Sequence, residues 1–258
     1  MQIALLADIH GNDIALEAVL ENVEKNGGVD AYWILGDLVA IGHAPIRVLE
    51  LLRNLPAEII RGNTDRYVCT GDRPGPFLEQ VQADSKLLPA LVEVEGDFSW
   101  CQGAVTVAGW LEWLSKLPLE YRTQLPDKTD ILCVHASPGT DDGNGINQNM
   151  RQHEIEDQLL DCKESLICVG HTHRPFSIEV NGKHIINPGS VSNPVGEDVR
   201  ASYAIIDANE NGYQVEHHRV DYDQQAVIEI LEDIKHPARR FIIKHLRGEI
   251  RIDYSREP

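Results

Sequence analysis

The stretch that decides the fold is residues 1–12, MQIALLADIHGN, because an apolar run ends there in polar residues of types that bind metals. The run Ile3–Ala7 predicts a buried strand, and Asp8 and His10 follow it directly. Asn12 is then a favourable N-cap for a helix. In an α/β protein, ligands collect at the carboxyl ends of the strands. This stretch therefore predicts the first strand of an α/β fold and the first part of a site.

The same pattern continues through the first 63 residues. The first helix is expected to end at Gly27-Gly28, and a second begins near Pro45, between strands at Tyr32–Leu35 and Ile59-Ile60. This βαβαβ order predicts a parallel sheet covered by helices. The later expected elements are a strand at 131–134, a helix at 154–160, a strand at 166–169, hairpins over 176–186 and 201–217, and a helix at 227–234.

Two segments lie outside this frame. Residues 72–126 predict helices at Leu78–Leu91 and Trp100–Leu117, which we place beside the site as a partial lid. Residues 236–258 hold six Lys or Arg against three Asp or Glu. This tail is open to three interpretations: an arm docked on the body, an oligomer contact or a solvated extension. The preferred interpretation is the simplest one, a segment at the protein surface. We therefore predict one domain over 1–235 and a basic tail over 236–258.

The composition excludes several classes of function. Lys and Arg number 23 against 41 Asp and Glu, giving a formal charge of −18. This charge argues against nucleic acid and against an anionic membrane surface as partners. No apolar run reaches the roughly 18 residues that a membrane span needs. The five cysteines have no CxxC spacing, so we expect a reducing cytoplasm. A homo-oligomer stays open, since Trp100, Trp110 and Trp113 suit either an interface or a helix core.

Further polar residues of metal-ligand type follow other predicted strands. Gly36-Asp37 and Gly62-Asn63 come after the second and third strands, His135 follows 131–134, and GHTH at 170–173 follows 166–169. Each residue alone has a common structural explanation, such as a turn or a buried histidine. Five strand ends in register favour a shared metal site instead. Its candidate ligands are Asp8, His10, Asp37, Asn63, His135, His171 and His173.

The spacing of these residues has a physical reason. Residues i and i+2 of extended backbone face the same side, so Asp8 and His10 are expected to aim into one cavity. The same argument applies to His171 and His173. The glycines at 36, 62 and 170 are expected either to allow close approach of backbone to that cavity or to adopt turn conformations. We also expect carboxylates near the histidines to fix their tautomers.

The donor set indicates the kind of metal. Seven nitrogen and oxygen ligands are too many for one tetrahedral zinc, and they suit two ions that share a carboxylate. Because no thiolate is present, borderline or hard divalent ions such as manganese, iron, nickel or zinc are expected. We expect two divalent metal ions, with manganese first among these.

The chain resembles the calcineurin-like metallophosphoesterase superfamily in the order of its motifs, D-x-H, GD, GN, H and GHTH. Finer matches at 7–12, 187–191 (NPGSV) and 200–203 (RASY) are similar to the small prokaryotic branch of YfcE-like phosphodiesterases and predicted phosphatases. The resemblance runs from residue 1 to about residue 207. It does not clearly cover the middle helices or the basic tail.

The resemblance implies an α/β fold, a four-layer α/β/β/α sandwich of mixed sheets. It also implies that Asp37 bridges two ions and that a hydroxide between the ions is the nucleophile. It implies the remaining ligands as well, with Asp8, His10 and His173 on one ion and Asn63, His135 and His171 on the other. Asp37, Asn63 and His135 are thus the predicted catalytic residues. The amide of Asn63 is also expected to donate to a phosphoryl oxygen.

One position departs from the family pattern. Many members have His after Gly-Asn, and that His is proposed to protonate the leaving group, whereas this chain has Thr64. The small prokaryotic branch commonly lacks this His too, and its loss predicts better turnover of good leaving groups. His43 is a candidate substitute, although an exposed loop histidine is the preferred interpretation. The six histidines without motif support are interpreted as non-ligands, namely His153, His184, His217, His218, His236 and His245.

Three arginines are candidates to anchor a substrate anion, Arg61, Arg66 and Arg200. Arg200 is preferred because it begins the matched RASY stretch. Asn193-Pro194-Val195 stands where the branch has Gln-Pro-Arg, which removes one expected substrate contact.

We therefore predict a cytoplasmic, di-metal-dependent phosphoesterase that hydrolyses phosphodiesters or activated phosphoesters of small molecules. A phosphomonoesterase or a dinucleoside-polyphosphate hydrolase is the alternative within enzymes. A metal-binding protein-interaction scaffold is the rival outside them, because a retromer subunit uses this fold for protein contacts with a degraded ligand set. The intact ligand set of this chain argues against that rival.

Overall fold

The computed structural model describes residues 1–249, and within them the strands form two five-stranded mixed sheets. The first sheet has the order β10 (Gly212–Val220), β9 (Ala201–Asn209), β1 (Gln2–Leu6), β2 (Ala31–Ile34) and β3 (Ala57–Ile59). The second has the order β4 (Glu120–Gln124), β5 (Asp130–Val134), β6 (Leu166–Cys168), β8 (Lys183–Asn187) and β7 (Phe176–Val180). The β1, β2 and β3 strands are parallel, as are β5, β6 and β8, whereas β9, β10, β4 and β7 run antiparallel to their neighbours.

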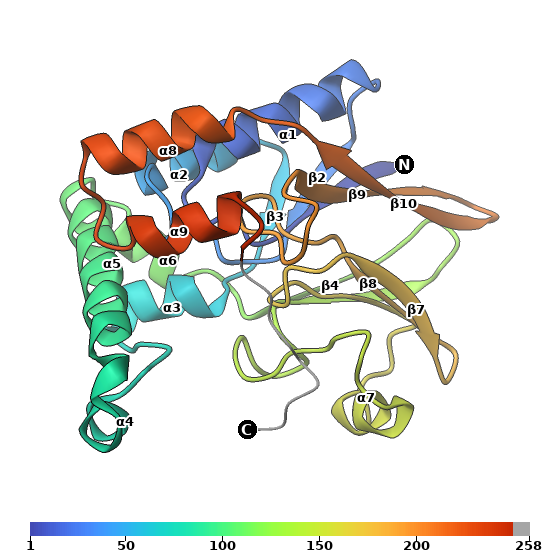
Figure 1. Ribbon diagram of the computed structural model, residues 1–258. Helices are drawn as coiled ribbons and strands as arrows, with labels where there is room; N and C mark the ends of the chain where they lie inside the picture. The colour runs from blue at the N-terminus through green and yellow to red at the C-terminus, as the bar shows by residue number, and fades with distance from the viewer. Residues whose placement is uncertain (250–258) are drawn as a thin grey trace.

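The helices flank the two sheets on their outer faces (Figure 1). They are α1 (Asp13–Lys25), α2 (Pro45–Arg53), α3 (Asn63–Thr70), α4 (Leu78–Ala83), α5 (Leu88–Val107), α6 (Leu111–Ser115), α7 (Gln152–Gln158), α8 (Gln224–Asp233) and α9 (Arg239–Leu246). A 3₁₀ turn at Ser85–Leu87 connects α4 to α5. No helix within residues 1–249 has the length and apolarity to cross a membrane.

Three apolar cores separate the layers. Alternating residues of β1 divide between two of these cores, because successive strand side chains point to opposite faces. Ile3 and Leu5 pack against Cys133 and Cys168 of the second sheet. Leu6 instead packs toward the helices on the other face, and a third core joins the second sheet to α7. The result is the predicted four-layer α/β/β/α sandwich.

Local signals explain why the first helix starts where it does. The Asn12 side chain accepts a hydrogen bond from the Ala15 N–H at 3.0 Å, as its predicted N-cap role requires. Leu16, Val19 and Val23 are buried on one face, and Lys25 ends the helix one residue before Asn26. The predicted β1–α1–β2–α2–β3 order is therefore confirmed within one or two residues at each boundary.

The middle segment differs from the prediction. One helix, α5, runs through the expected break between Leu91 and Trp100. Gly96 lies inside this helix, where glycine costs helix stability. Packing outweighs that cost, since a Cβ at Gly96 would lie 2.9 Å from the Cβ of Pro237. The sequence patterns also missed α3, β4 and α9.

The first part of the predicted basic tail is folded onto the body. Ile242, Ile243 and Leu246 of α9 are buried against α8, and Ile14 and Ile41 pack at the edge of this cluster. Of the three interpretations left open for the tail, residues 239–246 fit the docked arm. Residues 250–258 of that predicted tail lie outside the described residues.

Candidate metal centre

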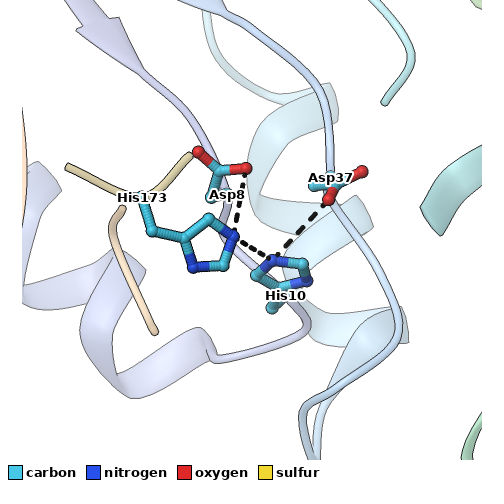
Figure 2. Close-up of side chains that lie close together, drawn as sticks. All are labelled: Asp8, His10, Asp37 and His173. Carbon is cyan, nitrogen blue, oxygen red and sulfur yellow. Dashed lines mark hydrogen bonds and ion pairs between the residues drawn. The ribbon is translucent and has the colours of Figure 1, made fainter. Parts of the chain in front are cut away.

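Four of the predicted ligands form a tight buried cluster. Ligand atoms of Asp8, His10, Asp37 and His173 all lie within 4.8 Å of one another. The His10 Nε2 atom lies 3.2 Å from His173 Nε2 and 3.7 Å from Asp37 Oδ2, and Figure 2 shows these side chains converging. The Asp8 Oδ1 atom lies 3.5 Å from His173 Nε2. These contacts bring together loops that follow β1, β2 and β6.

The other three predicted ligands form a second group beside it. The Asn63 Oδ1 atom lies 3.0 Å from His135 Nε2 and 3.1 Å from His171 Nδ1. The two imidazole nitrogens are themselves 3.3 Å apart. These residues follow β3, β5 and β6, so the five strand ends do converge as the motif spacing predicted.

Asp37 stands between the two groups. Its Oδ2 faces His10, whereas its Oδ1 lies 3.4 Å from His135 Nε2 and accepts the Thr64 N–H at 2.9 Å. The carboxylate is almost fully buried, with 2% of its residue surface exposed. This is the position that a carboxylate shared by two ions would need.

The backbone of the site differs from the expected extended form. Asp8, His10, His171 and His173 have φ of 56°, 48°, 66° and 58°, and Asp37 has φ of 54°. This left-handed region is uncommon for residues other than glycine, and it concentrates at functional sites. The two D-x-H and H-x-H pairs therefore converge through tight left-handed turns, and the extended-backbone reasoning was wrong although its outcome holds.

The tautomers of three histidines are fixed by backbone carbonyls. His135 Nδ1 lies 2.6 Å from Leu35 O, His171 Nε2 lies 2.8 Å from Gly143 O, and His173 Nδ1 lies 2.6 Å from Asn193 O. A carbonyl can only accept, so each of these ring nitrogens carries the proton. The expected partners were carboxylates, and the structure corrects this. Carbonyls serve equally well as the outer partners that orient metal-binding histidines.

The donor set fits divalent cations. In its neutral form, each of the three fixed histidines directs a lone pair toward other acceptor atoms of the site, an arrangement that repels unless a cation or a proton lies between them. Two buried atoms, Asp8 Oδ2 and His10 Nδ1, have no hydrogen-bond partner among the described residues. Nitrogen and oxygen donors without thiolates suit manganese, iron, nickel or zinc. The residues could hold two such ions.

The pKa values of His135 and Asp8 also indicate that the buried carboxylates of the site favour a nearby positive charge. Burial lowers the pKa of His135, but the adjacent Asp37 carboxylate outweighs burial and raises it to about 10. Burial also raises the pKa of Asp8 to about 6, against the opposing effect of His173. A bound cation would replace the proton that the chain alone places on His135.

Two glycines allow the loops to approach one another. A Cβ at Gly62 would lie 2.1 Å from Asp37 Oδ1, and a Cβ at Gly36 would lie 2.4 Å from Gly62 N. Any side chain at either position would displace backbone or the central carboxylate. The prediction that glycines 36 and 62 serve close approach is confirmed.

Sequence reasoning missed Asp65, which holds these loops in place. Its carboxylate accepts the N–H groups of Leu38 at 2.9 Å, Val39 at 3.2 Å and Gly62 at 2.8 Å, and the residue is fully buried. It therefore ties the loop after Asp37 to the loop that carries Asn63. The available signal was its place three residues after Gly62, where an acidic side chain caps the start of a helix.

The predicted arginine anchors have acidic partners in this structure. Arg61 Nε and Arg66 Nε both lie within 2.9 Å of a carboxylate oxygen of Asp141, and Asp141 is buried. Arg200 is exposed and pairs with Asp198 at 2.7 Å. The carboxylates hold Arg61 and Arg66 against the loop that follows His135.

Two histidines have surroundings that the sequence did not predict. His43 is a buried residue whose Nε2 lies 2.8 Å from Asp13 Oδ1, so the preferred interpretation as an exposed loop histidine was wrong. His245 of α9 is also buried, with its ring centre 6.5 Å from that of His173. Among the described residues, neither belongs to the cluster of candidate ligands.

Comparison with known proteins identifies the family. A family model described as a calcineurin-like phosphoesterase superfamily domain matches residues 1–211. The chain belongs to the calcineurin-like phosphoesterase superfamily. An uncharacterized protein of Methanocaldococcus jannaschii is 30% identical over 238 residues, spanning 86% of this chain and 88% of that protein. Membership makes this phosphoesterase a phosphoric ester hydrolase and confirms the predicted superfamily.

Solved structures agree with the fold of this phosphoesterase. A metallophosphoesterase of Sphaerobacter thermophilus is 26% identical with a TM-score of 0.74, covering 96% of this chain and 99% of that one. A hypothetical protein of Pyrococcus horikoshii, at 21% identity and a TM-score of 0.79, covers 97% and 99%. The symmetrical bis(5'-nucleosyl)-tetraphosphatase of Sodalis glossinidius matches over 96 residues at 34% identity, which is 33% of this phosphoesterase and 34% of that enzyme.

Proposed function

We propose that this protein is a two-metal phosphodiesterase that hydrolyses phosphodiesters or activated phosphoesters of small molecules. One observation carries the proposal. The Asp37 carboxylate lies between two groups of nitrogen and oxygen donors, and its two oxygens face different groups. Such an arrangement suits two ions that share one carboxylate, as in two-metal hydrolases.

The residues divide into two ligand sets in this proposal. Asp8, His10 and His173 would hold one ion, while Asn63, His135 and His171 would hold the other. Asp37 would contact both. When bound, the two cations would lower the pKa of a water molecule and offset charge on the phosphoryl oxygens.

The side chains of the site have separate tasks around the phosphoryl group. Asn63 Oδ1 points at the imidazoles of His135 and His171, and its amide NH₂, which also reaches the Tyr67 hydroxyl, would donate to a phosphoryl oxygen. Arg200 stays a predicted substrate contact, and this role requires its guanidinium to turn from Asp198. Asn63, which is held in place at the site, needs no such rearrangement.

The leaving group receives no proton from position 64. The Thr64 hydroxyl donates to Val39 O at 2.9 Å and its N–H donates to Asp37, so both polar groups hold the loop. A threonine hydroxyl is also too weak an acid for this task near neutral pH. The proposal therefore favours substrates whose leaving group is stable without protonation.

A dinucleoside-polyphosphate hydrolase is the second candidate. The matched third of the bis(5'-nucleosyl)-tetraphosphatase of Sodalis glossinidius supports it. Such substrates carry a good phosphate leaving group, which agrees with the absence of an acid at position 64. A phosphomonoesterase fits less well, because its alkoxide leaving groups need a proton.

The test is hydrolysis by chelator-treated protein with manganese, nickel, zinc, iron or magnesium added back. The substrates are bis-p-nitrophenyl phosphate, p-nitrophenyl phosphate and a dinucleoside tetraphosphate. Diester turnover that a transition metal restores, with manganese expected first, supports the proposal. Rapid tetraphosphate or monoester turnover with little diester turnover would favour the alternatives. Ion binding without hydrolysis of any substrate would instead favour a scaffold.

We also propose a cytoplasmic location for this enzyme. Its five cysteines are free, and three of them, Cys101, Cys133 and Cys168, are buried. Free cysteines are typical of a reducing compartment.

A further inference from the structure

The loop that follows Asp37 is held in an unfavourable backbone conformation. Ala40 has φ of 64° and Ile41 has φ of 57°. A β-branched residue such as isoleucine rarely adopts the left-handed region, because its side chain crowds the backbone there. Two successive non-glycine residues with positive φ, such as Ala40 and Ile41, persist only where the surrounding structure holds them. The structure must therefore contain contacts that fix residues 38–43.

One of these contacts comes from the middle helical segment. Asp97 of α5 accepts the Ile41 N–H with both carboxylate oxygens, at 3.0 and 3.3 Å. Only 2% of Asp97 is exposed. Asp65 holds the other half of the loop through Leu38 and Val39. The loop behind Asp37 is thus held by two buried carboxylates from different helices.

The segment after α8 packs against Asp97 through His236. His236 Nε2 lies 3.5 Å from Asp97 Oδ1, and His236 is fully buried. The Ala238 N–H donates to His236 Nδ1 at 3.3 Å, so the ring proton is on Nε2, which has no hydrogen-bond partner among the described residues. The Trp100 ring packs edge-on against this imidazole, with ring centres 4.7 Å apart.

The α8–α9 connection approaches α5 closely at this point (Figure 1). A Cβ at Gly96 would lie 2.9 Å from Pro237 Cβ, so glycine is needed beside Asp97. The middle helical segment (72–126) and the connection between α8 and α9 therefore meet beside Asp97, which accepts the Ile41 N–H. Neither segment contributes one of the candidate ligands.

We propose that Asp97 is a positioning residue, which fixes the strained loop at Ile41 and thereby sets Asp37 between the two ligand groups. The inference deepens the proposed function and rests on it, because it assigns the middle helices a task in metal binding. The His236 imidazole packs beside Asp97, 3.5 Å from its Oδ1 atom. The segment over 72–126 then acts as a support for the site.

Three variants separate positioning from general stability. Asp97→Leu keeps a side chain of similar size but removes the acceptor for the Ile41 N–H. Asp97→Asn keeps an acceptor oxygen. Val105→Ala opens a cavity in the buried face of the same helix, two turns beyond Asp97, and leaves the hydrogen bonds to the Ile41 N–H in place. All three are compared with the unaltered chain after metal removal by a chelator.

The measurements are manganese titration by calorimetry and amide hydrogen exchange over residues 38–43. We expect Asp97→Leu to weaken manganese binding by at least about 10-fold and to speed exchange at Ile41. The manganese affinity of Asp97→Asn should stay within about 3-fold of that of the unaltered chain. This variant keeps an oxygen that accepts the Ile41 N–H, and the loss of affinity is expected to come from removing that acceptor. Val105→Ala should lower thermal stability while leaving manganese affinity unchanged.

Two results would overturn the inference in different ways. If Asp97→Leu binds manganese as tightly as the unaltered chain, Asp97 is only structural and the proposed function survives. If the unaltered chain binds no manganese or other transition ion, both proposals fail together. A loss of affinity in Val105→Ala equal to that in Asp97→Leu would also reject a specific positioning role.

Discussion

The Asp37 Oδ1 atom lies 3.4 Å from the Nε2 atom of His135, and both residues are buried. Burial raises the pKa of Asp37, but His135 outweighs burial and holds that pKa well below its usual range. The same contact raises the pKa of His135. In the metal-free chain these two residues balance each other's charge, and a bound cation would take over that balance.

Replacing the central carboxylate tests this relationship. Asp37→Asn should remove most bound metal and reduce diester hydrolysis by about 100-fold or more, since both ions lose a charged ligand. Metal content by mass spectrometry and turnover of bis-p-nitrophenyl phosphate measure the two effects. Asp157→Asn, an exposed change on α7, is the control and should alter neither. Unchanged metal content and hydrolysis in Asp37→Asn would reject the assignment of Asp37.

A methyl group placed against the Asp37 carboxylate should also weaken metal binding. Gly62→Ala puts a Cβ 2.1 Å from Asp37 Oδ1, so the loop must shift, with a cost to folding of about 1–3 kcal/mol. Gly103→Ala is the matched control, because a Cβ there meets nothing within 4 Å. That control should stabilise α5 by up to about 1 kcal/mol. Urea unfolding and manganese titration of both variants measure this, and equal behaviour of the two would contradict the close approach.

The pair formed by Asp97 and His236 predicts opposing effects of pH on stability. Burial raises the pKa of Asp97 to about 7, and it lowers that of His236 to about 4. The unfolded values are about 3.9 and about 6.5. As pH rises between about 4 and about 7, Asp97 therefore makes the folded state less stable. His236 makes it more stable between about 4 and about 6.5, so the two contributions largely cancel.

Single variants should expose each contribution. Between about pH 5.5 and about pH 6.5, the unfolding free energy of Asp97→Asn should rise by about 1 kcal/mol relative to the unaltered chain. That of His236→Gln should fall by a similar amount. Urea unfolding of metal-free protein at the two pH values measures both changes. Variants that keep the pH dependence of the unaltered chain would show that neither group has the stated pKa.

The identity of residue 64 predicts a dependence on the leaving group. With Thr64 engaged to Val39 and Asp37, nothing at that position protonates the departing oxygen. We expect kcat/KM to fall steeply as the leaving-group pKa rises across a series of substituted phenyl diesters. A flat series would mean that another group supplies the proton. His43 is held by Asp13, 2.8 Å away, so His43→Gln should leave the slope unchanged.

Sequence patterns predicted the parts of this protein that depend on local order. The N-cap at Asn12 and the parallel order of β1, β2 and β3 follow from capping chemistry and from alternating strands and helices. The seven candidate ligands could be named because each follows a strand that the apolar pattern predicts. The left-handed backbone at Asp8 and His10 could not be predicted, because a D-x-H spacing is equally compatible with extended backbone.

The contacts that orient the histidines and hold the loop at Ile41 could not be predicted from the sequence, for a different reason. The carbonyls of Leu35, Gly143 and Asn193 orient the histidines, and every residue has a carbonyl, so no side-chain pattern marks them. Asp97 and Ile41 are 56 residues apart, and their contact arises only when α5 packs beside the loop. Long-range contacts of this kind come from tertiary packing.

Whether two ions share Asp37 can be seen by anomalous X-ray diffraction from crystals grown with manganese. We expect two anomalous peaks in each molecule, one on either side of the Asp37 carboxylate. One peak should contact Asp8, His10 and His173, and the other should contact Asn63, His135 and His171. A single peak, or a pair of which only one contacts Asp37, would show that Asp37 does not bridge two ions.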